Sequence, residues 1–150
     1  MRVTAKVDYA VRALVELAAA GGTVKGERIA QAQSIPLKFL ENILSELRRA
    51  GIVGSQRGAE GGYRLSRPAA EVSVADVIRA VEGPLADVHG TPPEDLQPPG
   101  AAAPVREVWL ATRAALRSVL EVVTIEDIAT RSLPVIVADL LADPAAWARR

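Results

Sequence analysis

The chain has 150 residues, 49% of them hydrophobic and 3% aromatic, which predicts one globular domain, or one domain with an appended segment, whose core is built from Ala, Val, Ile and Leu. Its 18 basic and 18 acidic side chains leave no net charge to indicate a partner. The absence of cysteine excludes disulfides and thiolate metal sites.

The charges nevertheless divide the chain into a basic front and an acidic rear. Residues 1–70 carry 11 basic and 6 acidic side chains, whereas the remainder carries 7 basic and 12 acidic ones. A basic front suits a polyanion such as nucleic acid. No apolar stretch approaches the ~18 residues of a membrane span, and Arg12 and Glu16 interrupt the run near the N-terminus that a secretory signal would need. We therefore expect a cytoplasmic protein with no membrane partner.

Two helices are predicted before residue 34. Apolar residues recur at helical spacing from Val7 to Ala18 and stop at Gly21 and Gly22. A shorter helix is expected over residues 23–33. A tight connection then leads to a third helix, in which Pro36 should be the first helical residue, because its missing N–H would be unsatisfied there anyway. Two short helices joined so closely are typical of a helix-turn-helix.

The third helix, over residues 36–49, has two distinct faces. Five apolar residues fall on one side of the helical wheel and predict a core face: Leu37, Leu40, Ile43, Leu44 and Leu47. The opposite side carries hydrogen-bonding and charged groups: Lys38, Glu41, Asn42, Ser45 and Arg49. Such a stripe suits a helix that reads DNA bases, and it equally suits an ordinary solvated face.

A β-hairpin is predicted directly after this helix. Residues 52–56 are expected to form one strand, residues 57–62 a glycine-rich turn and residues 63–65 the returning strand. The glycines allow a close approach to another surface, and Arg57 and Arg64 bring permanent cations to it. A helix that fits the major groove, followed by a cationic hairpin, is the arrangement of a winged helix-turn-helix.

The rear half begins with a helix that starts after Ser73 and ends at Gly83. Asp76 completes a variant capping box with Ser73 at the start of this helix. Residues 84–103 are proline-rich and aperiodic, and we expect a flexible loop. Pro104 should open the longest helix of the chain. Thr124 and Asp127 repeat the capping pattern before a short helix, and residues 135–141 form a last apolar turn or two.

The helix after Pro104 carries a long stripe of residues on or near one face, which is either intrachain core or a subunit interface. The stripe consists of Val105, Val108, Trp109, Thr112, Ala115, Leu116, Val119, Leu120 and Val123, and all but Ala115 are the dimerisation residues we predict. A two-fold dimer would place two reader helices ~34–36 Å apart, one turn of duplex DNA.

At five places the sequence resembles the Rrf2 family of bacterial transcriptional regulators. They are the N-terminal segment around Lys6, Tyr9 and Arg12, the segments 37–41, 78–84 and 124–128, and the glycine wing 57–65 with Arg67 and Pro68 after it. The resemblance extends to about residue 133. It implies a mainly helical fold with a small β-hairpin wing, that is, a winged helix-turn-helix followed by a long dimerisation helix. We accordingly divide the chain into a DNA-binding domain (1–83), a loop (84–103) and a dimerisation region with C-terminal helices (104–150).

Carried over by position, the resemblance implies base contacts from Lys38, Glu41 and Arg57 and phosphate contacts around Lys6, Tyr9 and the wing glycines. Arg57 suits a guanine edge and Glu41 a cytosine amino group, each contact typically contributing ~1–3 kcal/mol of discrimination. A phosphate-bound Arg57 and a solvent-facing Glu41 are the alternatives. The full predicted DNA-binding set is Lys6, Tyr9, Lys38, Glu41, Asn42, Ser45, Arg49, Arg57, Gly58, Gly61, Gly62, Tyr63 and Arg64.

The chain departs from the family in its loop. Many members bind an iron–sulfur cluster through three cysteines there, whereas this loop offers Asp87, His89, Glu94 and Asp95, which do not suit a cluster. We predict no cofactor. A metal held by Asp8 and His89 is the weaker alternative to a helix-capping role for Asp8. In the wing, Glu60 stands where a basic or small residue is common, and should lower non-specific DNA affinity.

The sequence therefore predicts a homodimeric, sequence-specific DNA-binding regulator, in the first instance a repressor, acting on a pseudo-palindromic operator in double-stranded DNA. It could respond to a small-molecule or protein effector or repress constitutively. The alternative is a winged helix used for protein–protein contact. An enzyme is not expected, because His89 is the sole histidine and no catalytic constellation can be assembled around it.

Overall fold

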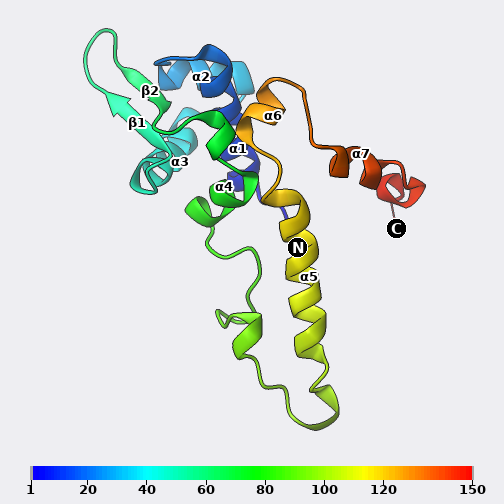
Figure 1. Cartoon of the computed structure of the whole chain (residues 1–150). Coiled ribbons are helices and arrows are strands. Elements are labelled where there is room, and N and C mark those ends of the chain that lie inside the picture. The colour runs from blue at the N-terminus through cyan, green and yellow to red at the C-terminus, as the bar shows by residue number, and fades with distance from the viewer. Residues whose placement is uncertain (1, 150) are drawn as a thin grey trace.

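The front half of the chain packs around one apolar core in the computed structural model, which describes residues 2–149 (Figure 1). Its elements are α1 (Ala5–Ala20), α2 (Gly26–Gln33), α3 (Leu37–Arg49), β1 (Val53–Gln56), β2 (Gly62–Leu65) and α4 (Val74–Val81). Helix α1 lies at the centre and buries Leu14 and Leu17 against the other helices. The predicted core face of α3 is confirmed for Leu40, Ile43, Leu44 and Leu47, which are fully buried. The prediction is wrong for Leu37, which is 37% exposed because it lies in the first turn, beside the hollow next to the wing.

Helix α1 has a definite start and stop. The Thr4 side chain accepts a hydrogen bond from the Val7 N–H, which satisfies one of the donors left free at a helix N-terminus. At the other end Gly21 takes the left-handed conformation, with φ of 65°, and its N–H donates to the Leu17 carbonyl. The predicted termination of the first helix at the glycine pair is therefore confirmed.

The second and third helices begin later than the sequence predicts. Helix α2 starts at Gly26 because Val24 instead pairs with Tyr63 of β2, through N–H to carbonyl hydrogen bonds of 2.8 Å in both directions. Pro36 is the N-cap of α3 and not its first helical residue. With ψ of 123° it is outside the helical conformation, while its carbonyl accepts from the Phe39 and Leu40 N–H groups at 3.0 Å.

Strands β1 and β2 form the predicted antiparallel hairpin, with Val53 opposite Leu65 and Gln56 opposite Gly62. Gly61 and Gly62 are required at the base of its turn. A Cβ on Gly61 would lie 2.8 Å from the Gly58 carbonyl oxygen, and one on Gly62 would lie 2.6 Å from the Val24 carbonyl carbon. The wing is therefore in backbone contact with the segment that leads into α2.

The rear half begins at α4, where the predicted capping box is present: the Asp76 N–H donates to Ser73 Oγ and the Ser73 N–H donates to Asp76 Oδ2. Within residues 84–103 the chain forms the short 3₁₀ turns η2 (Pro93–Asp95) and η3 (Gly100–Ala102). Next come α5 (Val105–Leu120), α6 (Ile125–Ala129), α7 (Val135–Leu141) and the 3₁₀ turn η4 (Pro144–Trp147). Thr124 and Asp127 cap α6 as predicted. At 16 residues α5 equals α1 in length, so the expectation that it is the longest helix is wrong.

Helix α5 extends away from the front half, and α7 extends away from the front half in a different direction (Figure 1). None of the residues of α5 is buried, and Val108 is 56% exposed. Beyond α6 the segment of α7 and η4 exposes Val135 and Trp147 by more than 70%. Among residues 2–149, no helix combines the length and hydrophobicity required to cross a bilayer.

Candidate nucleic-acid interface

The predicted reader stripe lies on the outer face of α3. Lys38, Glu41, Asn42 and Arg49 are exposed, and Ser45 is half-buried. None of these five side chains takes part in an ion pair or a side-chain hydrogen bond within residues 2–149. Because the helix packs its apolar side so tightly, the polar side is presented as a rigid surface whose groups are free to meet a ligand.

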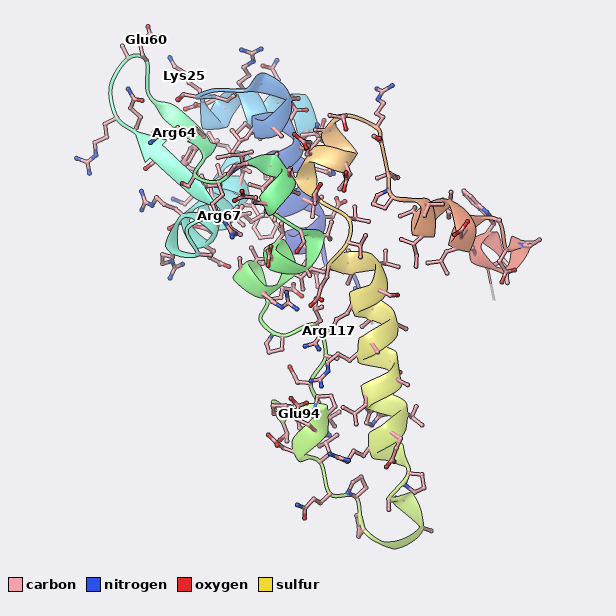
Figure 2. All side chains as sticks on the ribbon, viewed as in Figure 1. Lys25, Glu60, Arg64, Arg67, Glu94 and Arg117 are labelled. Atoms are coloured by element: carbon pink, nitrogen blue, oxygen red, sulfur yellow. The ribbon has the colours of Figure 1, made fainter. Side chains whose placement is uncertain are left out.

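The wing presents Arg57 and Arg64, both exposed, beside this surface. Arg64 extends along the hairpin over Gly54, where a Cβ would come 3.7 Å from the guanidinium carbon. Tyr63 has a different position: its ring packs on Gly26 at the start of α2, so that it supports the wing from behind. Glu60 lies at the tip of the loop (Figure 2).

A hollow of about 310 Å³ separates the wing from the N-terminal ends of α2 and α3. It is lined by Lys25, Leu37, Glu41, Gly58, Gly61, Gly62 and Tyr63, among others. The structure therefore brings together Glu41 of the predicted stripe and the predicted wing glycines, which are separated in the sequence.

Three further cations belong to the same part of the molecule and are absent from the predicted set. Lys25 lies at the N-cap of α2, Arg28 lies within α2, and Arg67 follows β2 (Figure 2). All three are exposed and none is ion-paired within the described residues. The excess of basic residues before position 70 is the sequence signal that could have identified them.

Lys6, which the resemblance assigns to phosphate contact, is engaged inside the chain. Its Nζ lies 2.7 Å from Glu46 Oε2 of α3 and donates to the Val81 carbonyl of α4 at 2.7 Å. The ammonium group therefore connects three helices. Phosphate contact by Lys6 stays a prediction, but the local geometry favours a structural role.

Tyr9 and Arg12 also join elements of the front half. The Tyr9 ring meets the Phe39 ring of α3 edge-on, with centroids 5.7 Å apart, and the Arg12 guanidinium lies 5.4 Å from the Tyr9 centroid. Arg12 Nη1 pairs with Asp8 Oδ2 at 3.0 Å, and Nε donates to Gln33 Oε1 at 2.9 Å. Asp8 thus has a cation as its partner, which is consistent with the reading of Asp8 as a structural carboxylate.

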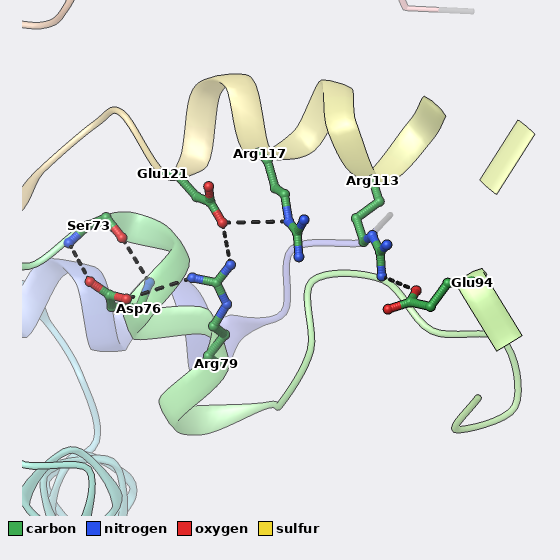
Figure 3. Close-up of polar contacts among 7 residues, drawn as sticks. All are labelled: Ser73, Asp76, Arg79, Glu94, Arg113, Arg117 and Glu121. Carbon is green, nitrogen blue, oxygen red and sulfur yellow. Dashed lines mark hydrogen bonds and ion pairs between the residues drawn. The ribbon is translucent and has the colours of Figure 1, made fainter. Parts of the chain in front are cut away.

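Three arginines of the rear half are paired with carboxylates, as Lys6 and Arg12 are in the front half. Arg79 contacts Asp76 and Glu121, Arg117 contacts Glu121 at 3.5 Å, and Arg113 contacts Glu94 at 2.6 Å (Figure 3). The pKa of Glu94 is lowered by a backbone hydrogen bond in the first place and by Arg113 in the second. The cations of α2, α3 and the wing therefore stay available to a polyanion, as do the isolated Arg2 and Arg131, which also have no carboxylate partner within the described residues.

The predicted dimerisation stripe is divided by its surroundings. Val105, Val108, Trp109 and Thr112 are exposed, Leu116, Val119 and Leu120 are half-buried, and Val123 is buried at 7% exposure. Leu120 and Val123 approach the front half, and the Val123 carbonyl accepts a hydrogen bond from the Val74 N–H at 2.9 Å. The outer part of the stripe has no covering element within the described chain.

The loop after α4 does not provide the ligands of an iron–sulfur cluster. Asp87 accepts the Gly90 N–H, Glu94 is ion-paired with Arg113, and His89 is exposed. Within residues 2–149 no three histidine or acidic side chains gather closely enough to hold a metal ion. Without thiolates these residues do not fit a cluster.

The family model described as "Rrf2: Iron-dependent Transcriptional regulator" matches residues 3–131. Rv1287 of Mycobacterium tuberculosis H37Rv, named as an HTH-type transcriptional regulator, is 49% identical over 95% of this chain and 90% of its own length. The HTH-type transcriptional regulator CymR of Bacillus subtilis is 36% identical over 87% of this chain and 91% of its own.

Solved structures of such regulators also superpose on this chain. The structure of CymR, titled the global cysteine regulator of B. subtilis, superposes with a TM-score of 0.73 at 34% identity and covers 87% of this chain and 98% of that one. IscR of T. potens superposes with a TM-score of 0.70 at 30% identity, covering 88% of each chain. The mainly helical winged fold predicted from the sequence is thus confirmed.

Proposed function

This chain belongs to the Rrf2 family of transcriptional regulators and is not an enzyme, and from that premise we propose that it acts as a homodimer on a two-fold operator in duplex DNA. Helix α3 enters the major groove of each half-site, and the wing lies along the adjacent backbone. The bound protein represses transcription where its operator overlaps a promoter.

The distribution of ion pairs carries this proposal. The cations of α2, α3 and the wing have no carboxylate partner within the described residues, whereas Arg79, Arg113 and Arg117 of the rear half are all paired. A cation held by a carboxylate releases little free energy on meeting a phosphate, because that pair must first be broken. Exposed unpaired cations displace counterions from DNA, which is the main source of its affinity for proteins.

Base recognition is assigned to Lys38, Glu41 and Arg57. Glu41 and Lys38 stand on successive turns of the exposed face of α3, and Arg57 begins the wing turn. A guanidinium can donate to O6 and N7 of guanine together, and a carboxylate can accept from the amino group of cytosine. Asn42, Ser45, Arg49, Arg64 and the backbone N–H groups of Gly58, Gly61 and Gly62 are assigned to the flanking bases and phosphates.

Dimerisation is assigned to the outer face of α5, with Val105, Val108, Trp109 and Thr112 at its centre. These exposed residues lie along a helix that would bury them against the same helix of a second copy, and each Å² of apolar area so removed from water contributes about 25 cal/mol. Two-fold symmetry would then present both α3 helices to one side of a duplex.

The proposal is tested by selecting bound sequences from a random duplex pool and then measuring the affinity of variants by fluorescence anisotropy. Arg57→Ala should weaken binding to the selected operator by ~5- to 150-fold for each half-site, because a lost bidentate base contact costs about 1–3 kcal/mol, while changing the affinity for random DNA little. Arg64→Ala should weaken binding to both DNAs. Arg131→Ala, an exposed cation after α6, serves as the matched control and should change neither affinity.

Failure to recover any motif, together with an affinity for DNA that does not fall with rising salt, would refute DNA binding and favour the alternative of a protein-interaction module. Equal losses for Arg57→Ala on operator and random DNA would reduce Arg57 to a phosphate contact. A recovered motif without two-fold symmetry would refute the dimeric mode.

A further inference from the structure

A cavity of about 390 Å³ lies where the front half meets α5. It is bounded by the segment before α1, the C-terminal end of α4, the turn that follows it, and the middle of α5. Its apolar lining consists of Val3, Val7, Ile78, Leu85, Trp109 and Leu116. The proposed DNA-binding surface shares none of these residues, so the cavity has no part in DNA contact.

Charged groups of both signs stand at the rim of this apolar cavity. Glu82 and Asp87 supply carboxylates, and Arg2 supplies a guanidinium. Glu82 accepts a hydrogen bond from the Thr4 hydroxyl, and Asp87 accepts the Gly90 N–H through Oδ1, so each carboxylate is held in place while it retains capacity for another donor. Arg2 has no ion-pair partner within the described residues.

We propose that this cavity is a binding site for a small zwitterion with an apolar body, of which an apolar α-amino acid is the simplest example. The ammonium group of such a ligand meets Asp87 and Glu82, its carboxylate meets Arg2, and its side chain fills the space beside Leu85, Trp109 and Leu116. An organic cation would leave Arg2 unmatched, and an organic anion would meet two carboxylates. A zwitterion satisfies both signs at once.

The position of the cavity gives the ligand a mechanical role, which rests on the proposed function. The C-terminal end of α5 is fixed to the front half, because Val123 accepts the Val74 N–H and the Ile125 N–H donates to the Val72 carbonyl, each at 2.9 Å. The rest of α5 diverges from the front half (Figure 1). A ligand wedged between α4 and α5 sets the angle of that divergence, and hence the spacing of the two reader helices in a dimer.

Ligand binding can be measured without DNA, because the chain has two tryptophans and Trp109 lines the cavity. In a Trp147→Phe variant the remaining tryptophan is Trp109, which also lies on the face assigned to dimerisation, so the titration is made where light scattering shows no change of oligomeric state. We expect L-leucine, L-isoleucine or L-phenylalanine to change this emission saturably, and hexylamine and hexanoate, which each carry one charge, to bind roughly tenfold or more weakly. No saturable change with any of the three amino acids, or equal binding of a single-charge compound, overturns the proposal.

Variants localise the site. Asp87→Asn should weaken amino-acid binding by roughly tenfold or more, whereas Asp95→Asn, an exposed position of the same loop outside the cavity lining, should leave it unchanged. Ala86→Trp, which fills the cavity, should abolish binding, and Ala101→Trp at the exposed end of the loop should not; both are measured by isothermal titration calorimetry, in which an added tryptophan gives no signal. Equal effects within either pair overturn the assignment.

The effect on DNA is measured separately, by the anisotropy of the selected operator with and without saturating amino acid. A shift in operator affinity that disappears in Ala86→Trp supports the regulatory role. An unchanged affinity, with the emission change intact, refutes the mechanical role. Loss of operator binding by the unliganded protein would instead refute the proposed function and leave the ligand site standing.

Discussion

Replacing Lys6 with methionine decides between two roles for this residue. Its side chain is 30% exposed, its partner Glu46 is 26% exposed, and its ammonium joins α1 to α3 and α4 through two contacts of 2.7 Å. The methionine retains most of the aliphatic packing and removes the charge. If Lys6 is structural, the variant loses charge-assisted hydrogen bonds and leaves the Val81 carbonyl without its donor.

We expect Lys6→Met to lower the free energy of unfolding by about 2 kcal/mol, since a hydrogen bond to a charged group contributes ~1.5–3 kcal/mol and partial exposure lets Glu46 turn to water. For a chain of this size that corresponds to a fall in Tm of about 4–8 °C. Urea and thermal unfolding measure both quantities. A cycle with Glu46→Gln should give a coupling free energy of about 1 kcal/mol.

The same variant tests the phosphate-contact prediction through its salt dependence. Each phosphate contact contributes about 0.9 to the slope of log affinity against log salt, so a dimer that lost one contact per subunit would show a slope smaller by about 1.8. Arg28→Met, an exposed and unpaired cation of α2, is the control that should leave stability unchanged. Unchanged stability of Lys6→Met together with the reduced slope would refute the structural reading.

Three further predictions follow from the geometry. Gly62→Ala should destabilise the wing by ~2–4 kcal/mol, because its Cβ would collide with the Val24 carbonyl and break the paired hydrogen bonds between Val24 and Tyr63. Hydrogen exchange measures this loss as faster exchange of the Tyr63 amide, and an unchanged exchange rate would contradict the reasoning. Since the pKa of Glu94 is lowered, its ionised form stabilises the fold above the ordinary carboxyl pKa, and this contribution is lost as pH falls through the lowered value. The difference in urea midpoint between the wild type and Glu94→Gln should therefore shrink toward zero on acidification, and a constant difference would argue against the pairing with Arg113. Val108→Glu should convert the dimer to a folded monomer in light scattering while Ala19→Glu does not, and a dimeric Val108→Glu would exclude the outer face of α5 as the interface.

Much of the fold could be predicted from the sequence because its signals are local. Short stretches of a few residues each predict the apolar side of α3, the end of α1 at Gly21, and the capping boxes at Ser73 and Thr124. The structure contains all of these features. The start of α2 could not be predicted in the same way. It depends on pairing between Val24 and Tyr63, which lie far apart in the sequence.

The predicted site differs from the structure where partners come from distant segments. Lys6 and Arg12 have the spacing of surface cations on α1, and no pattern in the sequence identifies Glu46, Val81 or Gln33 as their partners. For the stripe on α5, periodicity identifies the apolar side of the helix. It does not identify which of these residues face the rest of the chain and which face outward. Exposure along α5 supplies that boundary.

The attachment of the hairpin at Gly62 restricts how this protein could switch. Two backbone hydrogen bonds join Val24 to Tyr63, and no side chain would fit between those segments. The base of the wing is therefore joined through its backbone to the segment that leads into α2. In the proposed dimer we therefore expect a signal to change the separation between the DNA-binding surfaces of the two subunits, and to leave the base of the wing in place against α2 within each subunit.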